Sequence, residues 1–409
     1  MNSKLKYIDL FAGCGGLSLG LHNSNAWEGV FAVEKNSDAF KTLHHNLIEN
    51  KNHFDWPDWL PIENYDINKV LREFKTQLLN LRNQVDLITG GPPCQGFSSA
   101  GRRNESDSRN KLVKSYIRFI RIVQPKIIFF ENVKGFTQKF KNNKDKGLRY
   151  SHYVESQLKK NSSYYESIGY DVHGELVNFA DFGVPQKRTR FILIGFRKDL
   201  NYGNPLDFFE NLEKEKLNFL KDKGLNSTTT LCQAISDLNG KRKIEYPFNK
   251  NFKTTKYTNT KSNYQRLMKG NVRSDIPNSH RLANHKTETI NKFEIMLANS
   301  ERNKSISSEL KDRLDIKKHT TIPTSSEEPC PSLTTLPDDF IHFDNARIFT
   351  VREYARIQSF NDWFQFKGKY TSGGKRRIND VPRYSQIGNA IPPLFGEQAG
   401  LIINDIIAK

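Results

Sequence analysis

Cys94 is the residue of this chain whose setting best suits a nucleophile. It lies in the sequence Gly90-Gly91-Pro92-Pro93-Cys94-Gln95-Gly96, after an apolar run at residues 85–89 that predicts a buried strand. The prolines fix the backbone before the thiol, and the glycines let a substrate approach closely. Active sites of parallel α/β sheets form at the carboxyl ends of strands, so the position predicts a displayed thiol. A cysteine taken alone is more often a small buried hydrophobe, so this interpretation depends on the residues around it.

A carboxylate and an arginine lie at the ends of two further predicted strands. Glu131 follows the apolar run 126–130, and Arg190 precedes the run 191–196. Burying a carboxylate is costly unless it is paired or protonated, which favours a functional role for Glu131 beside the Cys94 loop. Alternation along an extended chain predicts that Gln186, Arg188 and Arg190 share one side.

A glycine-rich turn near the start of the chain predicts a cofactor site. Tyr7-Ile8-Asp9-Leu10-Phe11-Ala12-Gly13-Cys14-Gly15-Gly16-Leu17 has the pattern of a strand, a tight turn and the start of a helix. Glu34 ends the next predicted strand, where an acidic side chain can bind ribose hydroxyls. Ser18 stands where the third glycine of a dinucleotide-binding turn would be, which weakens an NAD or FAD interpretation.

The elements that must position these residues alternate between strands and helices. Short apolar runs predict strands at residues 7–11, 30–34, 85–89, 126–130 and 191–196, and an amphipathic pattern predicts a helix at 111–123. This rhythm indicates an α/β fold with a mostly parallel sheet covered on both faces. Helices are also expected at 351–360 and at 393–408.

The segment from Arg197 to about His319 has a different character. It is rich in Lys, Asn, Thr and Ser and lacks the strand and helix rhythm. Between Lys241 and Arg281, aromatic residues lie among many basic ones, namely Tyr246, Phe248, Phe252, Tyr257 and Tyr264. Basic side chains can bind phosphates and aromatic ones can stack on bases, but a solvated, partly disordered insertion explains the composition equally well.

Bulk composition limits the partners. The 409 residues carry a formal net charge of +18, which favours a polyanionic partner such as nucleic acid. The four cysteines lack the paired spacing of zinc sites, so no metal is expected. No segment predicts a signal peptide or a membrane span, so a cytoplasmic protein without membrane contact is expected.

The ordered motifs of the chain closely resemble those of the DNA (cytosine-5) methyltransferase family, bacterial restriction–modification type. The resemblance covers most of the sequence outside the basic segment. It rests on Phe11-Ala12-Gly13-x-Gly15-Gly16, Pro93-Cys94-Gln95, Glu131-Asn132-Val133, Gln186-x-Arg188-x-Arg190, Arg352-Glu353-x-Ala355-Arg356-x-Gln358-Ser359-Phe360 and Gln386-Ile387-Gly388-Asn389-Ala390-Ile391-Pro392-Pro393.

The resemblance implies a reaction and assigns catalytic roles. Cys94 would add to C6 of a cytosine, so that C5 can accept a methyl group from S-adenosylmethionine. Glu131 would contact N3 and the exocyclic amine of the base, and Arg190 would bind its O2. Gln186 and Arg188 match residues that support this site and the catalytic loop.

Further residues match the family's binding positions. The cofactor positions are Phe11, Gly13, Gly15, Gly16, Leu17, Glu34, Asp66, Ile67, Pro92 and Asn389. The cytosine must be flipped out of the duplex, and residues 95–109 resemble the loop that closes over DNA. The DNA-binding residues expected in that loop are Ser98, Arg102, Arg103 and Arg109.

The implied architecture is a Rossmann-like S-adenosylmethionine-binding domain at residues 1–197, completed by 383–409, and a smaller target recognition domain at 198–382. The implied enzyme is a DNA (cytosine-5-)-methyltransferase that acts as a monomer on double-stranded DNA, with a cognate restriction endonuclease as a genetic partner. One alternative is a tRNA cytosine-5 methyltransferase, although the Cys-Phe-Thr element of that family is missing here. Another is a catalytically silent nucleic-acid binding protein, which would have no use for a displayed thiol.

Overall fold

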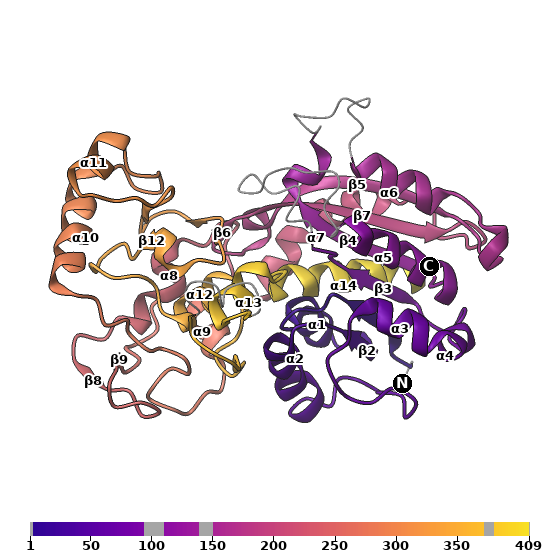
Figure 1. Cartoon of the computed structure of the whole chain (residues 1–409), viewed down its shortest axis with the longest axis horizontal. Helices are drawn as coiled ribbons and strands as arrows, with labels where there is room; N and C mark the ends of the chain where they lie inside the picture. Colours follow the sequence, from indigo (N-terminus) through magenta and orange to yellow (C-terminus); the bar gives the residue numbers. More distant parts are fainter. Residues whose placement is uncertain (1–2, 94–109, 139–149, 372–379, 409) are drawn as a thin grey trace. The chain divides into compact units, whose positions relative to one another are not determined.

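The computed structural model describes residues 3–93, 110–138, 150–371 and 380–408 (Figure 1). The chain forms two compact units. The first consists of Met1–Asn178, Thr189–Lys216 and Gly396–Lys409, and the second of Phe179–Arg188 and Leu217–Phe395. No helix among the described residues is long and apolar enough to cross a membrane.

A six-stranded sheet with the order β2-β1-β3-β4-β7-β5 is the centre of the first unit. Its strands are β1 (Leu5–Leu10), β2 (Trp27–Val33), β3 (Leu87–Gly90), β4 (Ile127–Val133), β5 (Tyr170–Asn178) and β7 (Thr189–Arg197). β1 to β4 are parallel, whereas β7 is antiparallel to both β4 and β5. The α/β fold with a mostly parallel sheet that we predicted is confirmed.

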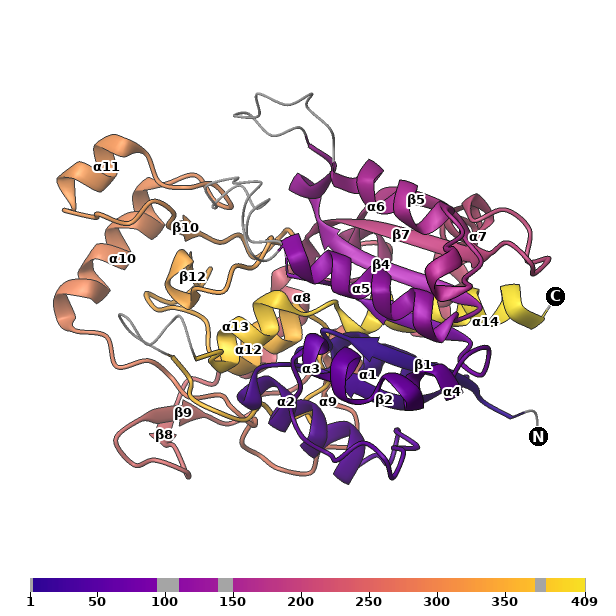
Figure 2. The same ribbon diagram turned by 45° about the vertical axis from the view of Figure 1, so that its right-hand side comes forward.

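Helices cover both faces of this sheet, which explains why its strands are apolar on both sides. On one face Ile8, Leu10, Ile128 and Phe130 share a core with residues of α3 (Ile67–Glu73), α4 (Lys75–Asn80), α5 (Asn110–Val123) and α6 (Tyr150–Lys159). Figure 2 shows α5 on the near side of the strands.

The alternate strand residues face the opposite way, toward other helices. Phe129 of β4 packs edge to face on Phe208 of α7 (Leu206–Asp222). Trp27 of β2 donates its indole N–H to the carbonyl of Gly400 in α14 (Pro393–Ala408) at 2.9 Å. The last helix therefore returns to the first unit, where it lies against β2 and α1 (Gly16–Asn23).

The second unit is built from short elements. Three pairs of strands join β8 (Lys243–Glu245) to β9 (Lys253–Thr255), β10 (Ile322–Pro323) to β12 (Phe340–Ile341), and β6 (Gln186–Lys187) to β11 (Cys330–Pro331). Its helices include α8 (Leu231–Ile235), α9 (Asn263–Lys269), α10 (Thr287–Asn299), α11 (Ser308–Arg313), α12 (Val351–Ile357) and α13 (Arg383–Asn389).

The compact units divide the chain at different points from the domains that we predicted. Residues 179–188 belong to the second unit, residues 198–216 to the first, and the first unit resumes at residue 396. The segment 198–319, which showed no regular rhythm in the sequence, contains the helices α7 to α11.

The helix predicted at 351–360 is shorter than expected. It ends at Ile357 because Ser359 has a left-handed backbone with φ 61°. The N–H of Phe360 then bonds to the carbonyl of Ala355 at 2.8 Å, which closes the last turn. Glycine normally occupies such a position, and because a serine stands here this helix end was not predictable from the sequence.

Candidate active site

The glycine turn after β1 has a backbone that few residues could adopt. Phe11, Gly13 and Gly15 all have positive φ, at 59°, 58° and 87°. A Cβ added to Gly15 would lie 3.0 Å from Leu47 Cδ1, so this glycine allows close packing against the core. A Cβ added to Gly13 would meet no described atom within 4 Å, so Gly13 faces open space. The turn therefore leaves room for a ligand at Gly13.

Glu34 closes this turn from the end of the neighbouring strand. Its Oε2 accepts the backbone N–H of Gly13 at 2.9 Å, and its Oε1 accepts that of Asn36 at 2.7 Å. Desolvation raises the pKa of the Glu34 carboxyl, and the backbone N–H groups act in the opposite direction. Each oxygen keeps a further lone pair, so Glu34 can still accept a ligand hydroxyl.

The chain then brings Asp66 and Ile67 to the same place. The N–H of Tyr65 bonds to the carbonyl of Glu34 at 2.8 Å. Asp66 caps α3 by accepting the N–H of Asn68 at 2.9 Å, and Ile67 is buried. Partial burial raises the pKa of Asp66, but the bonds from Asn68 and Lys35 outweigh it and lower the pKa. Gly13, Glu34, Asp66 and Ile67 thus lie along one edge of the sheet.

The loops after β3 and β4 meet at this edge as well. Asn132 donates its side-chain amide to the carbonyl of Pro92 at 3.2 Å. A Cβ added to Gly91 would lie 3.0 Å from Oε2 of Glu131, so a larger residue would crowd the carboxylate. The described chain that leads toward Cys94 therefore lies directly against Glu131 and Asn132.

Glu131 and Arg190 form an ion pair, although 59 residues separate them in the sequence. The antiparallel register of β4 and β7 places Val133 opposite Arg190, and Arg190 Nε lies 3.0 Å from Glu131 Oε1. Both side chains are largely buried, with 14% and 13% of their surface exposed. Burial lowers the pKa of Arg190, and the charge of Glu131 acts in the opposite direction. An acid and a cation able to contact a polar ring therefore lie next to the Pro92 loop.

Gln186 and Arg188 are buried in the second unit and share one partner. Gln186 accepts the N–H of Leu333 at 2.8 Å, and Arg188 donates to the carbonyl of Leu333 at 3.3 Å and to that of Gly388 at 2.8 Å. These two side chains therefore lie together and anchor backbone segments, although a tight turn and not an extended chain joins them. Arg190 forms its ion pair within the first unit. Just before it, the N–H of Arg188 bonds to the carbonyl of Gln186, and this tight turn interrupts the extended chain.

The segment 386–393 is held by several bonds within the second unit. Gln358 donates to the carbonyl of Ala390, and Ser359 accepts the N–H of Leu394 at 3.1 Å. Asn389, the last residue of α13, is exposed. The motif that resembled a family pattern is thus a rigid turn that presents Asn389 to solvent within its unit.

Comparison with known proteins identifies the family to which the chain belongs. A model of the family described as C-5 cytosine-specific DNA methylase matches residues 5–404. The chain belongs to this family. It is therefore a DNA methyltransferase, and the resemblance predicted from the motifs is confirmed.

Relatives of this methylase align along nearly its whole length. The Type II methyltransferase M.DdeI of Desulfomicrobium norvegicum is 30% identical over 414 residues, covering 96% of this chain and 87% of that protein. M1.HphI of Haemophilus parahaemolyticus is 28% identical, covering 96% and 85%. The structure of a prophage-encoded DNA modification methyltransferase of E. coli superposes with a TM-score of 0.65 at 21% identity, covering 99% of this chain and 100% of that one, which shows the shared fold.

Several site residues predicted for the methylase lie outside the described residues. These are Cys94, Ser98, Arg102, Arg103 and Arg109. Their roles stay predictions. Leu17 is described and buried in α1, where a Cβ on Gly396 of α14 would lie 3.1 Å from its Cδ1, so its side chain packs against the last helix.

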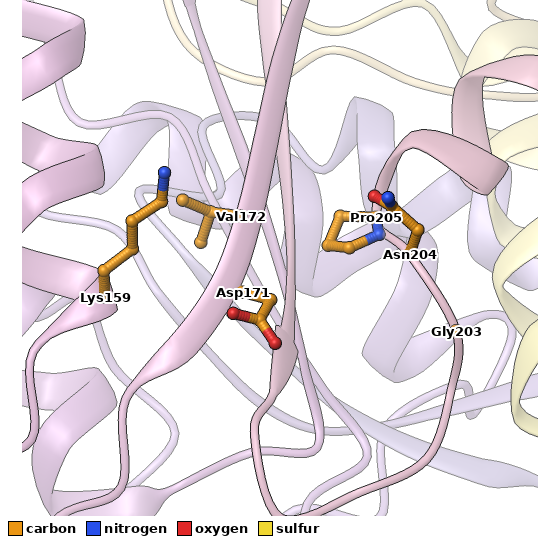
Figure 3. Close-up of a pocket in the computed structure, with 6 residues that line it drawn as sticks. All are labelled: Lys159, Asp171, Val172, Gly203, Asn204 and Pro205. Carbon is orange, nitrogen blue, oxygen red and sulfur yellow. The ribbon is translucent and has the colours of Figure 1, made fainter.

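A hollow of about 360 Å³ in the methylase lies elsewhere on the first unit. Figure 3 shows Asp171 and Val172 on β5 between Lys159 and the turn at Asn204 and Pro205. β5 begins there, opposite the end of β7 at Arg197, whereas Arg190 lies at the other end of β7. The hollow is therefore at the edge of the sheet away from Glu131. No group of described residues could hold a metal ion with three or more His, Cys, Asp or Glu ligands.

Asp9, a buried carboxylate beneath the glycine turn, was not predicted as a site residue. Ser18 donates to its Oδ2 at 2.5 Å and Thr89 donates to its Oδ1 at 2.9 Å, so Asp9 joins β1, α1 and β3. Desolvation raises the pKa of Asp9 to about 6, against the two hydroxyl bonds. The signal in the sequence was a single acid in an apolar strand. Ser18, the residue that departs from the dinucleotide pattern, is the hydrogen-bond partner of Asp9.

Proposed function

We propose that this methylase transfers a methyl group from S-adenosylmethionine to C5 of a cytosine flipped out of a specific short sequence in double-stranded DNA. We also propose that it is the modification enzyme of a restriction–modification system, since the relatives reported above are named Type II methyltransferases. The observation that carries the proposal is the Glu131–Arg190 ion pair beside the chain that leads to Cys94.

The residues of the glycine turn fit S-adenosylmethionine. Gly13 leaves open space where a Cβ would be, and Glu34 has free lone pairs for the two ribose hydroxyls. Asp66 and Ile67 would contact the adenine, and Pro92 would border the site. When bound, the cofactor supplies the electrophilic methyl group.

Cys94 performs the step that activates the base. Its thiolate sulfur forms a bond to C6, the π electrons of C5–C6 move to form a C4–C5 double bond, and those of C4–N3 take up a proton at N3 from the protonated form of Glu131. C5 then becomes nucleophilic enough to accept a methyl group. N3 returns its proton to Glu131, loss of the C5 proton to a base restores the C5–C6 double bond, and the sulfur leaves with the electrons of its bond to C6.

Arg190 and Glu131 share the task of binding the ring. The guanidinium of Arg190 has five N–H donors in a planar fork, so it can donate to the cytosine O2 while Nε stays near Glu131. Gln186 and Arg188 act at a distance, by fixing the chain just before β7.

The reaction is tested with labelled S-adenosylmethionine, duplex DNA and tRNA in parallel, followed by bisulfite sequencing of the DNA. We expect label in DNA at one recurring cytosine context. Label in tRNA alone would reject the DNA substrate, and the absence of label from both would reject the activity.

The role of Cys94 is tested with duplex DNA that contains 5-fluorodeoxycytidine, since fluorine at C5 blocks the proton loss that releases the enzyme. The wild type should form a covalent complex that survives a denaturing gel, and Cys94→Ala should form none and lose at least 10³-fold in turnover. Cys232→Ala, which removes a half-buried thiol of the second unit, should behave as the wild type. A covalent complex with Cys94→Ala would remove this residue from the nucleophile role.

A further inference from the structure

The hairpin of β8 and β9 in the second unit holds an aromatic ring in solvent. The side chain of Phe248 is 82% exposed. It lies in a turn in which the N–H of Asn249 bonds to the carbonyl of Tyr246 at 3.0 Å. Pro247 occupies the second position of that turn, which its fixed φ suits. Phe248 is therefore exposed because a hydrogen-bonded turn holds this part of the chain.

Tyr246 supports the exposed ring from below. It is almost fully buried, and its ring packs edge to face against Phe248 with 5.5 Å between the centroids. Its hydroxyl bonds to the hydroxyl of Tyr370 at 2.7 Å. Phe248 is thus attached to a side chain that cannot move freely.

Tyr370 belongs to a stack of alternating aromatic rings and arginines, formed by Phe252, Arg281, Tyr370 and Arg383, which we call the arginine–aromatic stack. The guanidinium of Arg281 lies between the rings of Phe252, at 3.9 Å, and Tyr370, at 3.7 Å. Arg383 lies over Tyr370 at 4.3 Å. Cation–π contacts of this kind favour a single arrangement of the base of the hairpin.

The segment 280–284 fixes the other side of the hairpin. Thr254 donates to the carbonyl of His280 at 2.5 Å, the N–H of Leu282 bonds to the carbonyl of Lys253 at 2.9 Å, and Asn284 donates to the carbonyl of Asn251 at 2.9 Å. The hairpin would therefore lose little conformational entropy when a partner binds its tip.

The hairpin is strongly basic around Phe248. Residues 241–256 contain six basic side chains and one acidic one. Lys241, Arg242, Lys243, Lys250 and Lys253 are all exposed, and among the described residues the hairpin's one ion pair joins Lys256 to Asp275. A hairpin that exposes five cations and one apolar ring matches a polyanion that also offers apolar groups.

We infer that this hairpin enters a groove of the target DNA, where Phe248 contacts bases and the surrounding cations bind phosphates. The apolar group that a duplex presents in its major groove is the thymine methyl, so an apolar contact there depends on sequence, whereas a phosphate contact does not. Phe248 is thereby assigned as a specificity-determining residue. This inference rests on the proposed function and goes beyond it by naming the contact.

The test compares binding to two duplexes, one with the sequence that the wild type methylates and one with that sequence scrambled. Phe248→Ala should weaken binding to the first about tenfold and to the second less than twofold, and should leave the dependence on salt unchanged. Phe248→Tyr should retain most of the preference. Tyr164→Ala removes an aromatic ring of similar exposure, 79%, from the first unit and should change neither affinity.

A second variant tests the cations. Lys241→Ala/Arg242→Ala/Lys243→Ala should weaken binding to both duplexes by the same factor and lower the slope of log K against log salt by about 2 to 3, because each phosphate contact contributes about 0.9. Thermal unfolding checks that both variants are folded.

The outcomes separate this inference from the function that it rests on. If the wild type methylates no DNA, the proposed function fails. If the wild type methylates DNA but Phe248→Ala keeps the preference between the duplexes, or loses affinity for both equally, the assignment of Phe248 fails.

Discussion

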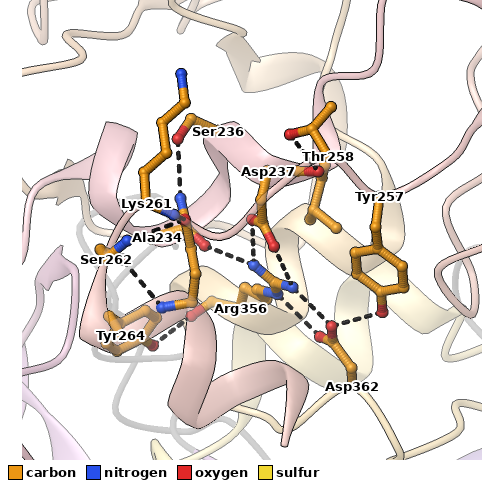
Figure 4. A network of polar contacts seen from close by, with 12 residues as sticks. Ala234, Ser236, Asp237, Tyr257, Thr258, Lys261, Ser262, Tyr264, Arg356 and Asp362 are labelled. Atoms are coloured by element: carbon orange, nitrogen blue, oxygen red, sulfur yellow. Dashed lines mark hydrogen bonds and ion pairs between the residues drawn. The ribbon is translucent and has the colours of Figure 1, made fainter. Parts of the chain in front are cut away.

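Two buried arginines of this methylase are paired with carboxylates in opposite ways. Arg190 makes one ion pair with Glu131 at 3.0 Å, and both side chains keep some exposed surface. The side chain of Arg356 has no exposed surface. Its guanidinium bonds to Asp237 at 2.6 and 3.1 Å and to Asp362 at 2.9 and 2.7 Å (Figure 4).

The two pairs also differ in the direction in which the pKa of the arginine is shifted. Burial alone would lower the pKa of Arg356, but Asp362 and Asp237 outweigh it and raise the pKa. At Arg190 burial prevails and the pKa falls. An arginine with unused donors in a partly open setting can exchange partners for a substrate, whereas one whose donors are all used can only hold the structure.

Removing Arg356 should have the largest effect on stability. Arg356→Met would leave Asp237 and Asp362 buried without their cation, which should lower the free energy of unfolding by about 3 to 5 kcal/mol. Chemical denaturation followed by circular dichroism measures this change.

A triple variant sharpens the test if the single one does not fold. Arg356→Met/Asp237→Asn/Asp362→Asn removes both charges as well and should recover most of the loss. Arg266→Met, which changes an exposed arginine of α9, should alter stability by less than about 0.5 kcal/mol. An unchanged stability in Arg356→Met would refute the contrast between the two pairs.

Glu131 should show the opposite balance, with a large effect on rate and a small one on stability. The amide of Glu131→Gln can still accept from Arg190 but cannot give a proton to the ring, so kcat should fall on the order of 10³-fold. Single-turnover methyl transfer measures the rate, and the melting temperature should move by less than about 2 °C.

Glu175→Gln is the matched control, because Glu175 lies in the same sheet and pairs with His173 at 3.0 Å. It should keep the wild-type rate. Full activity in Glu131→Gln would show that the ion pair at the sheet edge is structural.

Asp9 should give the smallest effect, visible only as pH changes. Its folded pKa, about 6, lies above its ordinary 3.8, so its proton stabilises the fold below about pH 3.8 and this contribution is lost as the pH rises through 6. Asp9→Asn does not titrate. Its stability relative to the wild type should therefore increase by roughly 2 to 3 kcal/mol between pH 4 and pH 7.5.

Denaturant midpoints across this pH range provide the measurement. Asp55→Asn, at an exposed carboxylate of the same unit, should follow the wild-type curve. Parallel curves for Asp9→Asn and the wild type would contradict the raised pKa.

The sequence predicted the fold best where strands are buried on both faces. The five predicted strands were apolar runs, and all five are strands of the sheet. β5 was missed because it is an edge strand, and its polar residues Asp171, His173 and Glu175 break the apolar pattern. The helices α7 to α11 were missed because the segment that contains them, 198–319, is rich in Lys, Asn, Thr and Ser and shows no regular rhythm in the sequence.

The positions of three predicted site residues could be inferred because each lies at an end of an apolar run. Glu34, Glu131 and Arg190 each end or begin an apolar run, and parallel strands bring such ends together. The partners of Arg356 were not predictable, because Asp237 lies 119 residues away in the sequence. The role of Ser18 required knowing that Asp9 is buried beneath it.

The hydrogen bond from Trp27 to Gly400 can form only after nearly the whole chain has been synthesised. The two residues are 373 positions apart, and ribosomes add about 5 to 20 residues per second, so β2 waits roughly 20 to 75 s for the helix that covers it. During that interval the apolar face around Trp27 is open to other molecules. The methylase is thus one of the proteins whose early half needs protection from aggregation until its last helix has emerged.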